Sequence, residues 1–184
     1  METRTRHVRT LTRERVRAVL SFSLGLALIL PAAVAAAPPA PPAPAASPSP
    51  APLAPGDVVT AFQAARLDGT LQRVDFPKGK NTLVLFFLSS CPVCHRMIPL
   101  WNDYYSRRPK DLEVFGVMLD REPPGFFDAM PIAFPVLRSP GPALHQMFRL
   151  RHVPFMVRVA PGGRVDSVSE GITDPIKLGE LFRP

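Results

Sequence analysis

Cysteine is scarce in this sequence, which has two cysteines among 184 residues. Two are too few for a small disulfide-stapled scaffold and too few for a four-thiolate zinc site. Charged residues make up only 20% of the chain and hydrophobic residues 46%, and this balance excludes a chain that is disordered throughout. No internal repeat is visible. The length predicts one folded domain, since a domain usually takes about 150 residues.

Acidic residues are in the minority, and the formal net charge is +7. Such a surplus would suit a nucleic-acid-binding protein if it lay on a folded domain. Residues 1–17, however, contain six arginines and two glutamates, so they carry +4 of the +7 and leave +3 for the rest of the chain. We therefore expect no nucleic-acid partner.

The N-terminus has the order of a secretory signal peptide. Its arginine-rich start is followed by an apolar run, Ala18–Leu30, and by the small-residue pattern Ala33–Val34–Ala35, which predicts cleavage before Ala36. No two arginines are adjacent there, which favours the general secretory route, and no cysteine lies nearby for a lipoprotein anchor. We interpret residues 1–35 as the signal peptide of a periplasmic or otherwise extracytoplasmic protein. The alternative is an uncleaved anchor that tethers the protein to the membrane, although Pro31 and the many alanines make a poor bilayer span.

Proline is unevenly distributed, with ten of the 24 prolines between Pro31 and Pro55. Residues 36–55 are almost entirely alanine, proline and serine, a composition that favours an extended, partly polyproline II linker. This linker is either a spacer behind a retained anchor or a tail left by cleavage. Residues 56–184 are long enough to form a compact domain with its own core.

Residues 56–184 alternate between strand and helix patterns. The continuous apolar run Asn81–Leu88 predicts a central strand covered on both faces, and residues 91–105 then change to helical spacing. Hairpins are expected around Asp68–Gly69 and Pro161–Gly163. Further strands are predicted at 112–119, 155–159 and 164–168, and further helices at 125–130, 142–148 and 174–182. This order predicts an α/β fold with a mixed central sheet flanked by helices and an N-terminal hairpin extension.

The chemistry is concentrated in the run Ser89–His95 (Ser-Ser-Cys-Pro-Val-Cys-His), which contains both cysteines. Cys91 lies where the central strand ends and the helix begins, so free backbone N–H groups and the helix dipole can stabilise its thiolate. Pro92 suits the first helical turn. The three-residue spacing places both sulfurs on one helix face, so a Cys91–Cys94 disulfide can form. We expect Cys91 to attack and Cys94, one turn further in, to resolve the mixed disulfide.

The strand, the Cys91–Cys94 motif and the following helix resemble the thioredoxin superfamily, in particular the exported TlpA/ResA-like and MauD-like thiol–disulfide oxidoreductases. Pro99 matches the proline that kinks the helix in that family, and Val153–Pro154 matches the cis-proline loop that faces the disulfide. The resemblance implies a thioredoxin-like fold in which Pro92, Val93, Val153 and Pro154 contact the substrate.

The same resemblance implies a cycle and a set of partners. It implies an enzyme that needs no metal or organic cofactor and that exchanges the Cys91–Cys94 disulfide with cysteine-containing exported proteins. Relatives of this kind usually act as reductases, so the expected electron source is a membrane donor of the DsbD/CcdA type.

Two positions depart from the family pattern. Ser90 stands where many relatives have a tryptophan before the first cysteine, and Met97 stands where several ResA-like reductases have a glutamate that assists proton transfer. The group that handles the proton of the resolving step is therefore unassigned. His95 and His152 are candidates, because imidazole titrates near neutral pH. Residues Asp120–Glu122 are interpreted as loop charges without assigned chemistry.

Two other functions fit the same motif. Residues Cys91–His95 also satisfy C-x-x-C-H, the haem attachment motif of c-type cytochromes, with the histidine as proximal ligand and Met118 or Met130 as distal ligand. The strong strand pattern before the motif argues against this interpretation, because small cytochromes c are mainly helical. The other alternative is a copper chaperone in which the two thiolates and His145 or His152 bind Cu(I). Copper chaperones of this fold, however, space their cysteines by three residues rather than two.

Overall fold

The computed structural model describes residues 51–184, so the predicted signal peptide and most of the predicted linker lie outside the described residues. The described part of the chain forms seven strands and four helices. In chain order these are β1 (Phe62–Arg66), β2 (Leu71–Val74), β3 (Asn81–Phe87), α1 (Pro92–Ser106), β4 (Leu112–Met118), α2 (Phe126–Ala129), β5 (Val136–Arg138), α3 (Pro142–Met147), β6 (Phe155–Val159), β7 (Val165–Glu170) and α4 (Pro175–Phe182). None of these four helices combines the length and the apolar character needed to cross a membrane.

All seven strands form one mixed sheet, in the order β2-β1-β5-β4-β3-β6-β7. The strand β3 is parallel to β4 and antiparallel to β6, and the hairpins β1–β2 and β6–β7 form the two edges. The fold class predicted from the sequence is therefore confirmed. Phe87 and Met118 lie opposite each other at the ends of β3 and β4, so the segments that follow these two parallel strands leave the sheet at the same edge.

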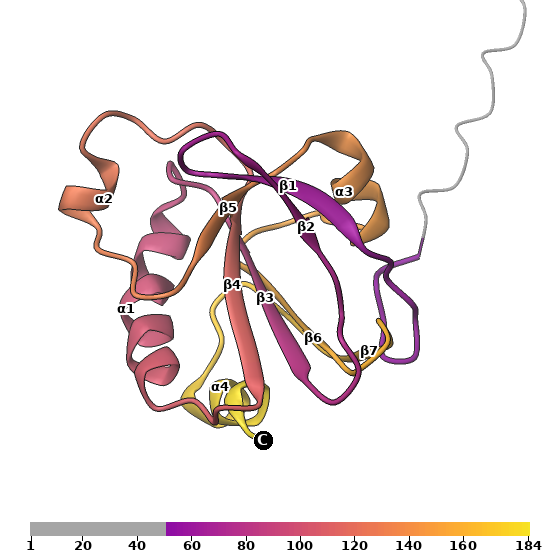
Figure 1. Cartoon of the computed structure of the whole chain (residues 1–184). Coiled ribbons are helices and arrows are strands. Elements are labelled where there is room, and N and C mark those ends of the chain that lie inside the picture. The colour runs from indigo at the N-terminus through magenta and orange to yellow at the C-terminus, as the bar shows by residue number, and fades with distance from the viewer. Residues whose placement is uncertain (1–50) are drawn as a thin grey trace, which may run out of the picture. The chain divides into compact units, whose positions relative to one another are not determined.

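Helices cover both faces of the sheet, and the side chains of β3 alternate between the faces. Leu83, Leu85 and Phe87 pack in one core with residues of α1 and α4, such as Trp101 and Leu178. The side chains between them pack in a second core with α3, which lies on the opposite side of the sheet from α1 and α4 (Figure 1). Burial on both faces explains why β3 reads as an unbroken apolar run. The second core also includes Leu53, from the last residues of the predicted linker.

The start of α1 is held at the end of β3 by a buried face of the helix. Met97, Ile98 and Trp101 are almost fully buried, and their three- and four-residue spacing forms the stripe that packs on the sheet. Cys91 is the N-cap residue, and Pro92 occupies the first turn, where a missing N–H group costs no hydrogen bond. The packing of α1 thus determines where its N-terminus and the two cysteines lie.

Candidate active site

The thiol of Cys91 occupies the N-cap position of α1. The backbone N–H of Cys94 donates a hydrogen bond to Cys91 Sγ at 3.3 Å, so the sulfur takes the place that a serine or aspartate oxygen usually fills at a helix start. This is the positive end of the helix dipole, which stabilises a thiolate. Both cysteines are free thiols in the structure.

The two thiols differ sharply in exposure. Cys94 has 0% of its surface exposed, whereas Cys91 is half-buried. Burial, followed by the hydrogen bond with Cys91, raises the pKa of the Cys94 thiol to about 12. Cys94 therefore remains protonated near neutral pH, and Cys91 is the thiol that another molecule can reach.

The loop before β6 lies against the Cys91 thiol. The Val153–Pro154 peptide bond is cis, and Cys91 Sγ lies 3.9 Å from the Val153 carbonyl oxygen as a hydrogen-bond donor. The Gly171 N–H donates to the Pro154 carbonyl at 2.8 Å, which ties the loop to the end of β7. Val153 and Cys91 are thus neighbours in the fold, although 62 residues separate them in the sequence. Pro92 is exposed, Val93 is half-buried and Pro154 is buried.

The two histidines predicted as proton-transfer candidates occupy different positions. His95 Nε2 lies 2.6 Å from the Ser89 carbonyl oxygen. Because a carbonyl only accepts hydrogen bonds, this nitrogen carries the proton and has no lone pair to offer a thiol. His152 is exposed next to Val153. Within residues 51–184, the hydrogen bonds of Cys91 and Cys94 go to backbone groups and to each other, and neither histidine takes part in them.

Asp120, which the sequence pattern indicated only as a loop charge, lies at the site. Its carboxylate accepts four hydrogen bonds, at 2.7 and 2.9 Å from the backbone N–H and hydroxyl of Ser89 and at 3.2 and 3.1 Å from those of Ser90. Asp120 follows β4 by two residues and Ser89 follows β3 by two. The parallel pairing of two predicted buried strands is therefore the signal that could have placed them together.

The hydrogen bonds keep the Asp120 carboxyl ionised. Burial by itself would raise the pKa of this group, but the hydrogen bonds from Ser89 and Ser90 outweigh burial, so the net pKa is lower than usual. The anion in turn contributes to the raised pKa of Cys94. A negative charge thus lies close to the buried thiol.

Two histidines named in the copper and haem alternatives, His145 and His95, make other contacts in the described part of the chain. No group of three or more histidine, cysteine, aspartate or glutamate side chains within residues 51–184 is arranged to hold a metal ion. His145 contacts the Ser139 hydroxyl at 3.3 Å, and the Nε2 atom of His95 is engaged by the Ser89 carbonyl.

Comparison with known proteins places this arrangement in a family. A family model described as Redoxin matches residues 49–159, a span that includes both cysteines and the cis-proline loop. The chain belongs to the Redoxin family. A search among curated proteins finds no match. As a member of this family, the chain is a thioredoxin-like thiol–disulfide oxidoreductase, and the resemblance seen in the sequence is confirmed.

Solved structures show the fold that the Redoxin chain shares. The thioredoxin domain of a thiol-disulfide oxidoreductase from Bacteroides vulgatus is 21% identical, with a TM-score of 0.61 and coverage of 72% of this chain and 99% of that chain. The structure of MTB dsbF is 26% identical, with a TM-score of 0.58 and coverage of 66% and 92%. The exposed lipoprotein thioredoxin of Streptococcus pneumoniae is 20% identical, with a TM-score of 0.58 and coverage of 66% and 98%.

Proposed function

We propose that this chain is an exported reductase that transfers electrons from its Cys91–Cys94 dithiol to disulfides of exported partner proteins. The observation that carries the proposal is the difference between the two thiols. Cys91 is accessible and lies at the N-terminus of α1, whereas Cys94 is fully buried with a pKa raised to about 12 by its burial. We therefore assign the attack on the partner disulfide to Cys91 and the resolving step to Cys94.

The exchange proceeds in two steps whose electrons balance. The Cys91 thiolate attacks one sulfur of the partner disulfide, which forms a Cys91–partner bond and releases the other partner sulfur as a thiolate. Cys94, after losing its proton, then attacks Cys91 Sγ and releases the second partner sulfur. The partner gains two electrons and the Cys91–Cys94 pair becomes a disulfide, which the electron donor reduces again.

The surface around Cys91 supports contact with an extended partner segment. Pro92 is exposed, Val93 is half-buried, and the Val153 carbonyl lies 3.9 Å from Cys91 Sγ. We propose that Pro92, Val93, Val153 and Pro154 contact the partner chain next to its disulfide.

The resemblance to TlpA/ResA-like proteins favours the reducing direction, because relatives of this kind usually act as reductases. We therefore propose that the protein is a reductase supplied by a membrane donor of the DsbD/CcdA type.

Export is proposed from the N-terminal sequence, which lies outside the described residues. The arginine-rich start, the apolar run Ala18–Leu30 and the Ala33–Val34–Ala35 pattern support a signal peptide. A similar structure is that of an exposed lipoprotein thioredoxin, which agrees with a site of action outside the cytoplasm. Mass spectrometry of the mature protein is expected to find Ala36 at the N-terminus, or Met1 if the anchor is retained.

The test compares Cys91→Ala and Cys94→Ala in the reduction of a disulfide-bonded protein such as insulin. Cys91→Ala is expected to abolish reduction, and Cys94→Ala is expected to accumulate a mixed disulfide. Equilibration of the wild-type pair with glutathione measures its potential, which we expect below about −200 mV. A potential near about −120 mV would contradict the reducing direction, and full activity in both variants would contradict the proposed chemistry.

A further inference from the structure

The two residues directly before Cys91 are held by one carboxylate. Asp120 accepts the backbone N–H and the hydroxyl of both Ser89 and Ser90, at distances of 2.7 to 3.2 Å. The Ser89 hydroxyl also lies 3.5 Å from the Arg121 carbonyl oxygen. Because these two serines connect β3 to α1, the position of Cys91 depends on this contact as well as on the packing of α1.

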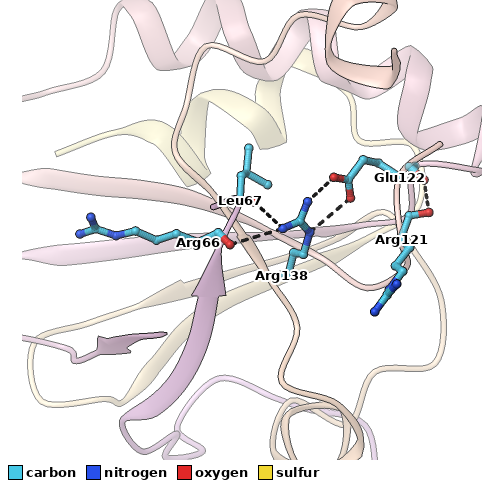
Figure 2. Close-up of polar contacts among 6 residues, drawn as sticks. Arg66, Leu67, Arg121, Glu122 and Arg138 are labelled. Atoms are coloured by element: carbon cyan, nitrogen blue, oxygen red, sulfur yellow. Dashed lines mark hydrogen bonds and ion pairs between the residues drawn. The ribbon is translucent and has the colours of Figure 1, made fainter. Parts of the chain in front are cut away.

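The loop that carries Asp120 is in turn fixed to the rest of the sheet. Arg138, the last residue of β5, forms an ion pair with Glu122, two residues after Asp120. The same guanidinium donates to the Leu67 carbonyl at 2.6 Å and to the Arg66 carbonyl at 3.5 Å. Figure 2 shows the Arg138 guanidinium between the Glu122 carboxylate and these two carbonyl groups. A polar connection thus runs from the β1–β2 hairpin to the turn before Cys91.

Of the two carboxylates on this loop, Asp120 is the one that acts on the buried thiol. The charge of Asp120 acts on Cys94 in the first turn of α1, Glu122 lies on the same loop as Asp120, and Arg138 reaches Glu122 from β5. Because Glu122 is paired with Arg138, the carboxylate that acts on Cys94 is that of Asp120. Hydrogen bonds from Ser89 and Ser90 outweigh its burial and lower the pKa of Asp120, so the charge persists across the neutral range.

We propose that Asp120 is the positioning residue of the dithiol: its carboxylate holds the Ser89–Ser90 turn that presents Cys91, and Arg138 holds its loop in place through Glu122. This inference rests on the proposed exchange function of the two cysteines. Asp120 acts through Ser89 and Ser90 and not by contact with the partner. Asp120 differs from the histidine candidates because its carboxylate accepts the backbone N–H groups of both serines, whereas His95 contacts only the Ser89 carbonyl.

The experiment measures kcat/KM for insulin reduction and the pH dependence of Cys94 ionisation in the reduced protein. Asp120→Asn removes the charge and replaces one carboxylate oxygen with an NH2 group. This group donates hydrogen bonds and cannot accept one from a backbone N–H such as that of Ser90. We expect kcat/KM to fall about tenfold, which corresponds to about 1.4 kcal/mol, and the ionisation of Cys94 to move to lower pH. Ser90→Ala keeps the charge, so it is expected to lower kcat/KM less and to leave the ionisation of Cys94 in place.

The matched control is Asp75→Asn, which removes a carboxylate from an exposed ion pair with Arg73 on the hairpin. It is expected to leave both readouts unchanged. Arg138→Gln, remote from the thiols, is expected to lower kcat/KM severalfold, and it carries the test if Asp120→Asn does not fold. Folded variants at Asp120 or Arg138 with wild-type kcat/KM and a wild-type Cys94 ionisation would overturn the inference. Full activity in Cys91→Ala would instead contradict the proposed function, so the two failures are distinguishable.

Discussion

At the scale of single residues, burial distinguishes the two cysteines on which the proposed exchange depends. Cys91 Sγ accepts the Cys94 N–H at the start of α1, while the Cys94 side chain has no exposed surface. The pKa of Cys94 rises to about 12 chiefly because its thiolate would be desolvated. A group whose pKa is higher in the folded state than in the unfolded state binds its proton more tightly when folded, and this links stability to pH.

The reduced protein is therefore expected to lose stability as the pH rises above about 9. Between the ordinary pKa of 9.0 and the raised value of about 12, the unfolded chain gives up the Cys94 proton while the folded chain retains it. The free energy of unfolding, measured with urea from about pH 8 to about pH 11, should decline over this range. Cys94→Ala should remove that part of the decline, and an equal slope in the variant would contradict the raised pKa.

The sequence predicted the residues of the dithiol but not its surroundings. The change from a strand pattern to a helix pattern at Cys91 is local, so the N-cap position and the exposure of Pro92 follow from neighbouring residues. Asp120 lies 30 or more residues from the serines that it holds, and only the pairing of β3 with β4 brings them together. The hydrogen bond from His95 to the Ser89 carbonyl depends on a side-chain rotamer, which no sequence pattern indicates.

At the scale of elements, the β6–β7 hairpin depends on one glycine in its turn. Gly163 has a φ of +94°, and a Cβ atom on it would lie 2.3 Å from the Val59 carbonyl oxygen. Its own carbonyl accepts the Val59 N–H at 2.8 Å, so the segment before β1 lies directly against the turn. The sequence predicted this hairpin from its Pro-Gly-Gly turn, while the close approach of Val59 requires the folded sheet.

Gly163→Ala is accordingly expected to be more destabilising than Gly162→Ala. Gly162 has a φ of +84°, and a Cβ atom on it would meet nothing within 4 Å, so both variants carry the cost of a left-handed alanine. Only Gly163→Ala adds the clash, which should cost about 1–3 kcal/mol more in the free energy of unfolding. Thermal or urea unfolding of the two variants measures the difference, and equal stabilities would contradict the contact.

At the scale of the whole molecule, a buried arginine joins the last helix to the sheet. Arg158, on β6, is only 3% exposed. Its guanidinium donates to the carbonyl groups of Leu181, Arg183 and Pro184 at 2.6 to 3.0 Å and pairs with Asp166 at 3.2 Å. The apolar pattern of β6 predicted a buried strand, but nothing in the sequence showed that its one charge would be satisfied by α4 and the residues after it.

Arg158→Met is expected to destabilise the protein by about 3 kcal/mol, because it leaves the buried Leu181 carbonyl and the partly buried oxygen atoms of Arg183 and Pro184 without their donor. Asp166→Asn is the matched control. Its side chain is 44% exposed, so removal of its charge should cost about 1 kcal/mol or less. Differential scanning calorimetry of both variants provides the comparison. A loss in Arg158→Met no larger than that in Asp166→Asn would show that the carbonyl contacts contribute nothing.

The central claim, that Cys91 attacks and Cys94 resolves, is tested most directly by the mixed disulfide itself. Reduced Cys94→Ala is mixed with a disulfide-bonded partner, quenched with acid and digested, and mass spectrometry locates the cross-link. The account predicts a partner peptide joined to Cys91 in this variant and little or none in the wild-type protein, where Cys94 releases it. A partner peptide on Cys94 in the Cys91→Ala variant, formed as fast as the adduct on Cys91, would contradict the account.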